Sequence, residues 1–440
     1  MNSDVISANK VQLQVPSSWQ IRPLKSLASF RKGLNILKVD LSDQGVRVIS
    51  YGQIHDKSNT GVKLADGLLR YIPQDLTRGG AGSRLRYGDL VFADTSEDLG
   101  GAGNAVFVDT DDEVFAGYHT VICRLHDENV LPKFLAYVVN SEWWRSQVRR
   151  HVSGVKVFSI TRRVLSSTFV QFPAYPEQRR IVQLLDAETA KIDQAMSLLH
   201  RELETMEQLK KSLIYEAVTK GLDPTVSMKP SGVEWIGDMP ERWRTTRIKY
   251  IALAWNGLTY DPADVSDTGT PVLRSGNVQN GELDLQNLVR VVGSIPEKSF
   301  ARSGDILICS RNGSRNLIGK NALIHQDGYA FGAFMMVARP TVNSQYFYYL
   351  LNSGIFDFYL PTYLTSTVNQ LTGTNFGNMI VPIVDDPDEQ LAIVEELNTK
   401  CKALDVAMEK KRAQLTLLRK KRDSVIFEYV TGKRCVSEVA

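Results

Sequence analysis

Residues 176–221 read PEQRRIVQLLDAETAKIDQAMSLLHRELETMEQLKKSLIYEAVTKG, and this stretch decides how the rest of the chain is organised. Alternating steps of three and four residues from Val182 to Leu213 mark ten positions, of which eight are apolar. The positions are Val182, Leu185, Thr189, Ile192, Met196, Leu199, Leu203, Met206, Lys210 and Leu213. Charged residues and Gln fill most of the places between them. This 3.5-residue period predicts a long helix that pairs with another helix along an apolar seam.

The partner is predicted from a repeat of the same pattern. Residues 387–433 read PDEQLAIVEELNTKCKALDVAMEKKRAQLTLLRKKRDSVIFEYVTGK, and adding 212 to each seam position gives a second seam from Val394 to Val425. Each stretch starts with Pro and acidic residues and ends near Gly, which suits the two ends of a helix. Because the second helix must return from a second globular part, the two helices are expected to pair antiparallel.

The globular parts repeat as well, at an offset of 224 near their starts, where Trp19 corresponds to Trp243 and Gly33 to Gly257. Short β-type runs are accompanied by one or two short helices without regular βα alternation, which favours an α+β fold. The chain is therefore a predicted tandem repeat. The expected parts are an arm (1–14), a first globular domain (15–175), a first helix (176–222), a linker and second globular domain (223–386), a second helix (387–433) and a tail (434–440).

Composition indicates an ordinary water-soluble protein. The 440 residues are 43% hydrophobic and 23% charged, with a net charge of +3. No apolar run approaches the ~20 residues that span a bilayer, and the N-terminus lacks the apolar core of a signal peptide. The four cysteines are scattered along the sequence, so we expect free thiols in a reducing compartment. We therefore expect a cytoplasmic protein with no membrane partner.

Catalytic motifs are missing from the sequence. It contains no phosphate-binding loop, no tetrapeptide of the amino-methyltransferase type and no metal-ligand cluster of His and Cys. The six histidines lie far apart in the sequence. We therefore expect no catalytic residues, no bound metal and no cofactor in this chain, and we disfavour a stand-alone methyltransferase or nuclease.

Four loops are rich in Arg, Asn, Ser and Thr instead. Arg can pair with guanine, Asn and Gln with adenine, and Lys with phosphate, so these loops are candidates for DNA contact. In the first half the candidates are Arg84, Arg86, Tyr87, Lys156, Ser159, Arg162 and Arg163. In the second half they are Arg311, Asn312, Ser314, Arg315, Asn316, Lys320, Thr367, Asn369 and Gln370.

Over nearly its whole length the chain resembles the specificity subunits of type I restriction–modification systems. The resemblance rests on SGVEWIGDMPERW (231–243), on the helix openings YPEQRRIVQLLD and PDEQLAIVEELN, on the endings YEAVTKGLDP and FEYVTGK, and on ILICSRNGSRNLIGKNALI. It implies that each globular half reads one part of a split site in double-stranded DNA. It also implies that the helices form a spacer and dock adenine-methylating modification subunits, two per specificity subunit. Those partners would carry S-adenosylmethionine and recruit the restriction subunits.

One departure concerns residues 93–103, ADTSEDLGGAG, which are the first-half counterpart of the SRNGSR loop. They are acidic, which argues against a base-reading role for this loop. The alternative function from another class is a coiled-coil adaptor that binds proteins and no nucleic acid.

Overall fold

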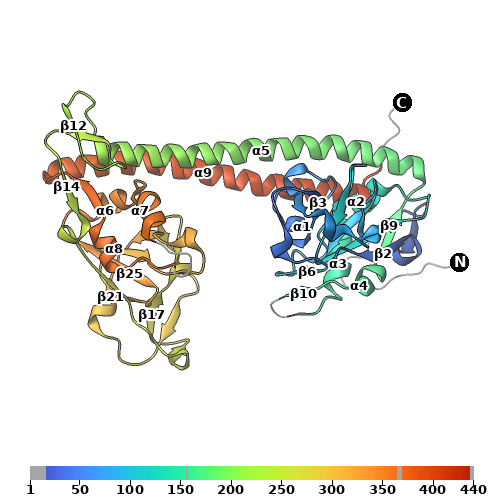
Figure 1. Cartoon of the computed structure of the whole chain (residues 1–440), viewed down its shortest axis with the longest axis horizontal. Helices are drawn as coiled ribbons and strands as arrows, with labels where there is room; N and C mark the ends of the chain where they lie inside the picture. Colours follow the sequence, from blue (N-terminus) through green and yellow to red (C-terminus); the bar gives the residue numbers. More distant parts are fainter. Residues whose placement is uncertain (1–15, 155–156, 364–368, 437–440) are drawn as a thin grey trace. The chain divides into compact units, whose positions relative to one another are not determined.

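The computed structural model describes residues 16–154, 157–363 and 369–436 and divides into two units (Figure 1). Unit 1 combines the chain up to Leu199 with the residues from Ala413 onward, and unit 2 is His200–Arg412. The long helices α5 (Tyr175–Lys220) and α9 (Pro387–Val430) each contribute a part to both units. The predicted arm 1–14, the last residues of the predicted tail, Lys156 and Thr367 lie outside the described residues.

In unit 2 the two helices pair antiparallel. Lys210 Nζ lies 2.7 Å from Asp405 Oδ1, and Lys411 Nζ lies 2.6 Å from Glu202 Oε2, so that ascending numbers on α5 meet descending numbers on α9. The predicted seam residues of both helices are buried or half-buried, and those between them are mostly exposed. The predicted antiparallel pairing along an apolar seam is therefore confirmed for this part of the helices.

In unit 1 the pairing repeats with the roles of the helices exchanged. Arg422 Nε lies 2.9 Å from Asp193 Oδ1, and the Arg422 side chain also donates to the carbonyl oxygen of Thr60 at 3.1 Å. Adding 212 to 210 gives 422, and subtracting 212 from 405 gives 193, so this ion pair is the repeat counterpart of Lys210–Asp405. The sequence repeat thus places equivalent ion pairs between α5 and α9 in both units.

The globular part of unit 1 is built on a four-stranded sheet in the order β2-β9-β5-β7 and a three-stranded sheet in the order β4-β3-β8. The strands are β2 (Ala28–Lys32), β9 (Thr120–Leu125), β5 (Leu90–Ala93), β7 (Ala105–Phe107), β4 (Arg70–Ile72), β3 (Val46–Ile49) and β8 (Val114–Ala116). Short helices α2 (Pro132–Val139), α3 (Glu142–Arg149) and α4 (Arg162–Ser166) follow. Strand β1 (Gln20–Pro23) pairs with β11 (Phe169–Phe172), which closes the part just before α5.

Unit 2 repeats this plan with a larger second sheet. Its four-stranded sheet has the order β15-β25-β22-β23, and its five-stranded sheet has the order β16-β20-β17-β24-β21. The strands of the first are β15 (Ala252–Asn256), β25 (Met335–Pro340), β22 (Ile306–Cys309) and β23 (Asn321–Leu323); those of the second are β16 (Val265–Ser266), β20 (Val289–Val291), β17 (Thr270–Leu273), β24 (Tyr329–Phe331) and β21 (Phe300–Ala301). Helices α6 (Ser344–Leu351), α7 (Ile355–Tyr363) and α8 (Gly373–Asn378) follow. The α+β prediction is confirmed.

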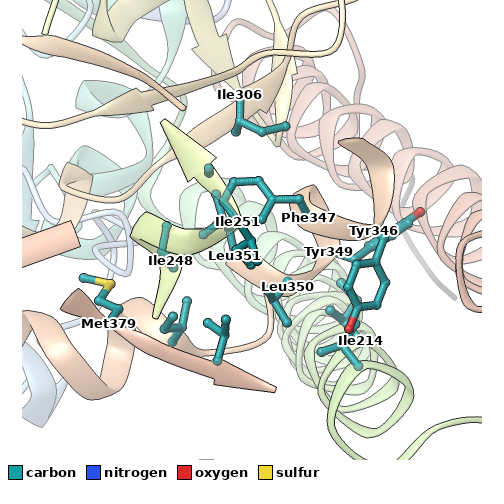
Figure 2. Close-up of a cluster of buried hydrophobic side chains, with 14 of the residues drawn as sticks. Ile214, Ile248, Ile251, Ile306, Tyr346, Phe347, Tyr349, Leu350, Leu351 and Met379 are labelled. Atoms are coloured by element: carbon teal, nitrogen blue, oxygen red, sulfur yellow. The ribbon is translucent and has the colours of Figure 1, made fainter. Parts of the chain in front are cut away.

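One apolar core joins the globular part of unit 2 to α5 and α9. Figure 2 shows Tyr346, Phe347 and Leu350 of α6 gathered with Ile214 of α5 and with Ile306 of β22. All five side chains are at most 4% exposed. Burying a side chain of this size stabilises a fold by about 2 kcal/mol, so α6 fixes the sheet against the helices.

Each unit also contains the same buried ion pair. Both carboxylate oxygens of Asp89 accept from the Arg124 guanidinium, at 2.7 and 2.6 Å, and Asp305 accepts from Arg339 in the same way at 2.7 Å. The aspartate side chains are 1% and 2% exposed. The pairs connect the strands β5 and β9 in unit 1 and β22 and β25 in unit 2, so they fix the central strands of both four-stranded sheets.

Within the residues that the structure describes, no helix combines the length and the apolar character needed to cross a bilayer.

Candidate nucleic-acid interface

In unit 2 the end of β22 meets two other segments and brings predicted residues together. Ser310 N and Arg311 N both donate to the carbonyl oxygen of Phe334, at 3.0 and 3.1 Å, and Leu371 N donates to the Ser310 carbonyl at 2.7 Å. Arg311 and Gln370 form an antiparallel bridge. We call this site the unit 2 corner; it consists of Ser310, Arg311, Phe334 and Gln370.

The Arg311 side chain is the central group of this corner. Its guanidinium carbon lies 5.0 Å from the centre of the Phe334 ring, and Phe334 is 57% exposed. A guanidinium stacked on an aromatic face keeps its N–H donors free at its edge. Among the described residues, no carboxylate forms an ion pair with Arg311. Its donors are therefore available to a ligand.

The loop after Arg311 is held in place by amide side chains. The Asn312 side chain accepts from Ser314 N at 3.0 Å and donates to Ser275 Oγ at 3.4 Å. Asn369 Nδ2 donates to the Gly313 carbonyl at 3.2 Å. Two of the amides predicted to read bases thus have bonds within the protein, and these bonds shape the loop.

The remaining candidates of this loop are open to solvent. Ser314, Arg315 and Asn316 are exposed, and Lys320 is half-buried with its Nζ 3.5 Å from Gln279 Oε1. In the part of the chain that the structure describes, neither Arg315 nor Lys320 pairs with a carboxylate. The nearby Cys309 thiol is not a nucleophile at neutral pH, because burial raises its pKa.

A hollow of about 420 Å³ borders the unit 2 corner. It is lined by Leu258, Thr259, Tyr260, Arg274, Ser275, Gly276, Gly332, Ala333, Phe334 and Met335. Arg274 is exposed and adds a further cation beside Phe334. Sequence reasoning missed Tyr260, Arg274 and Phe334, because they lie up to 50 residues from the SRNGSR loop and only the fold brings them to it.

Unit 1 has the equivalent corner at the end of β5. Asp94 N donates to the His119 carbonyl at 3.0 Å, Ile160 N donates to the Asp94 carbonyl at 2.7 Å, and Thr95 pairs with Ser159 between β6 (Thr95–Ser96) and β10 (Phe158–Ser159). We call this site the unit 1 corner; it consists of Asp94, Thr95, His119 and Ser159. Of the predicted residues, Ser159 belongs to it, and Arg162 and Arg163 follow on α4, where both are exposed.

The other first-half candidates lie elsewhere. Arg84, Arg86 and Tyr87 precede the start of β5, whereas the unit 1 corner follows its end, and a four-residue strand is about 13 Å long. Arg84 Nε lies 3.7 Å from Glu113 Oε1, and Tyr87 packs edge-on against Phe107. In Figure 1, β6, β10 and α4 lie on the side of unit 1 away from α5. The predicted residues of this half therefore form two separate groups.

The chain is similar to known proteins in sequence. Residues 240–417 match the family described as type I restriction modification DNA specificity domain. The chain is 22% identical over 342 residues to the MjaVIII specificity subunit of Methanocaldococcus jannaschii, which covers 73% of this chain and 76% of that protein. It is 27% identical over 206 residues to the EcoKI specificity subunit of Escherichia coli K12, covering 45% of this chain and 44% of that protein.

A solved structure shares the fold. A chain from a study of complex assembly and conformational transition of the type I R-M system aligns with a TM-score of 0.63 and 18% identity. The alignment covers 96% of this chain and 100% of that one. The fold of this chain is therefore one that a solved structure already has.

Proposed function

We propose that each globular part of this chain reads one half of a split DNA target. The chain belongs to the family of type I restriction–modification specificity subunits and has the DNA sequence-recognition role of that family. The unit 2 corner would read one half-site, and the unit 1 corner with Arg162 and Arg163 would read the other. The chain itself would perform no chemistry on DNA.

The observation that carries this proposal is that the two corners have the same backbone hydrogen bonds but different side chains. The bond from Asp94 N to the His119 carbonyl and the bond from Ser310 N to the Phe334 carbonyl are both 3.0 Å long. A symmetric dimer would present identical side chains and read a palindrome. A chain that contains the corner twice, with different side chains in each copy, can read two different DNA sequences.

The chemistry of the unit 2 corner suits base edges in the major groove. Arg311 has free donors that can form the paired bonds to O6 and N7 of guanine. Arg274, which lines the hollow, and Arg315 and Lys320, which follow Arg311 in the chain, would neutralise phosphates. Phosphate contacts would supply affinity, and Arg311 would supply discrimination.

The helices would set the gap between the half-sites and bind two modification subunits, which carry S-adenosylmethionine. Large apolar side chains on α5 and α9 remain open to solvent, among them Leu198, Leu209, Val406 and Leu417, which are 46%, 48%, 45% and 64% exposed. Apolar residues on a helix surface suit a protein partner. Restriction subunits would join through the modification subunits.

The absence of a catalytic role is part of the proposal. Across the described ranges, no group of three His, Cys, Asp or Glu side chains is placed to hold a metal ion. The corners contain Arg, Gln, Ser, Thr and an Asp–His pair, whose side chains can donate to or accept from base edges. Methylation would therefore take place in the modification subunits, which must extrude the target adenine from the duplex.

The test is to express the chain with the modification subunits of its own system in a methylation-free host and to map methylated adenines across the genome. We expect one split motif. Anisotropy titrations of a labelled duplex with that motif should then show an association constant that falls linearly on a log–log plot with salt. A complex that methylates no split motif and binds no duplex would favour the coiled-coil adaptor.

A further inference from the structure

The hydrogen bonds give a residue-by-residue correspondence between the two corners. Asp94 corresponds to Ser310, because each donates through its N–H to the end of the neighbouring loop and accepts through its carbonyl from a third segment, at 2.7 Å in both units. Thr95 corresponds to Arg311, because Thr95 pairs with Ser159 as Arg311 pairs with Gln370. His119 corresponds to Phe334.

The side chains at these positions differ in charge. Where unit 2 has Arg311 stacked on Phe334, unit 1 has Asp94 Oδ1 at 3.0 Å from His119 Nδ1. A carboxylate accepts only, so the proton of this bond lies on Nδ1. Within the described residues, no other hydrogen bond reaches the Asp94 carboxylate, whose side chain is 34% exposed. One oxygen of Asp94 is therefore open to a ligand.

His119 lies beside Asp94, and its side chain is 56% exposed. It adopts φ of 54°, a backbone conformation that is uncommon outside glycine. Its ring contacts Tyr51 and Tyr118, with ring centroids 5.5 and 6.0 Å away. Burial, and to a smaller extent Tyr51, raise the pKa of Tyr118, so its hydroxyl stays protonated. The backbone conformation and the ring contacts of His119 thus orient the Asp94 carboxylate.

The carboxylate is not needed to build the corner. Ser310 makes the same two backbone bonds in unit 2 without a carboxylate, and its hydroxyl donates to the Phe334 carbonyl at 3.0 Å. The unit 2 corner forms without such a carboxylate. The partly exposed, orientated carboxylate of Asp94 therefore has a role other than building the corner. The negative charge also opposes DNA phosphates, so it is expected only where a specific donor compensates it.

We propose that Asp94 is a specificity-determining residue of unit 1, and that it accepts a hydrogen bond from the exocyclic amino group of cytosine or adenine. Both amino groups are donors in the major groove, and carboxylates pair with the amino group of cytosine. His119 is a positioning residue that orients the carboxylate. This inference rests on the proposed function, and it reverses the expectation that the acidic loop takes no part in base reading.

The test compares the methylated motif of the wild-type complex with those of complexes that carry Asp94→Ser or Asp94→Asn. Asp94→Ser installs the residue that unit 2 has at this position. We expect discrimination at one base pair of the unit 1 half-site to fall by about tenfold, since one good base contact gives about that ratio. The other half-site should remain unchanged. His119→Phe should relax the same base pair and no other.

Asp112→Asn is the control, because Asp112 is also an aspartate of unit 1 in an ion pair, with Arg47 at 3.0 Å, is 59% exposed and lies outside the corner. It should leave the motif intact. Unchanged motifs in both Asp94 variants would overturn the inference, and so would loss of folding in Asp94→Ser seen by thermal unfolding. A wild-type complex that methylates no split motif would instead overturn the proposed function.

Discussion

Arg422 Nε lies 2.9 Å from Asp193 Oδ1 and joins the last part of α9 to the first part of α5. Its repeat counterpart, Lys210 with Asp405, joins the same two helices within unit 2 at 2.7 Å. The Arg422 side chain is 12% exposed, whereas that of Lys210 is 26% exposed and its partner is half-exposed. The two pairs hold equivalent positions, but they differ in burial.

This difference predicts unequal effects on stability. Arg422→Ala removes a shielded ion pair and a bond to the Thr60 carbonyl, and should lower the free energy of unfolding by about 2 kcal/mol. Lys210→Ala removes a more solvated pair and should lower it by less than about 1 kcal/mol. Urea unfolding followed by circular dichroism measures both. Equal losses would show that burial does not separate the two pairs.

The helices and the repeat could be predicted from the sequence because their signal is periodic. The seam from Val182 to Leu213 is marked by apolar residues at a fixed spacing, and the offset of 212 to Val394 needs only counting. The Gly88–Asp89 and Gly304–Asp305 pairs also repeat in the sequence, and they contain the buried aspartates that bind Arg124 and Arg339.

The corners could be predicted only in part, because they are made by three segments that are distant in sequence. Composition marked Arg311 and Gln370, but nothing local marks Phe334, which reaches Arg311 only through the pairing of β22 with β25. In the first half, composition favoured the basic residues Arg84 and Arg86, which precede β5. For the acidic residue after β5, Asp94, the sequence shows only a negative charge, and its contact with His119 is visible only in the fold.

The buried pair of Asp305 with Arg339 gives a second stability prediction. Asp305→Ala leaves the Arg339 guanidinium without its partner and leaves Arg302 N without its acceptor at 2.8 Å, so it should destabilise the protein by about 3 kcal/mol. Asp385→Ala breaks an exposed pair with Arg244 and should lower stability by less than about 1 kcal/mol. Thermal unfolding of both variants tests the order, and a reversed order would contradict the role given to Asp305.

Base reading by Arg311 predicts a local change in specificity. Arg311→Ala should weaken binding to the motif duplex by about 1–3 kcal/mol and relax one position of the unit 2 half-site. Arg302→Ala is the control, since Arg302 precedes β22, at the end opposite Arg311, and its side chain is 61% exposed. Methylation mapping of both variants decides: an unchanged motif in Arg311→Ala would exclude base reading by this residue.

The length of the helices is expected to set the gap in the target. Seven residues added after Leu199 and seven after Arg412 keep both seams in phase, because seven residues are one heptad. Each helix lengthens by ~10.5 Å, or about three base pairs at ~3.4 Å each. The gap in the methylated motif should widen by that amount, and affinity should fall because three base pairs rotate a half-site by ~100°. Methylation of the original motif with its gap unchanged would show that the helices are not the ruler.

The central claim is that the two globular parts read DNA separately. Its most direct test replaces residues 15–174 with the same part of a relative of known target, which leaves α5 intact from Tyr175, and maps methylated adenines in cells that contain the modification subunits. The account predicts a motif in which one half is that of the relative and the other half is that of the wild-type chain. A motif changed in both halves, or in neither, would contradict it.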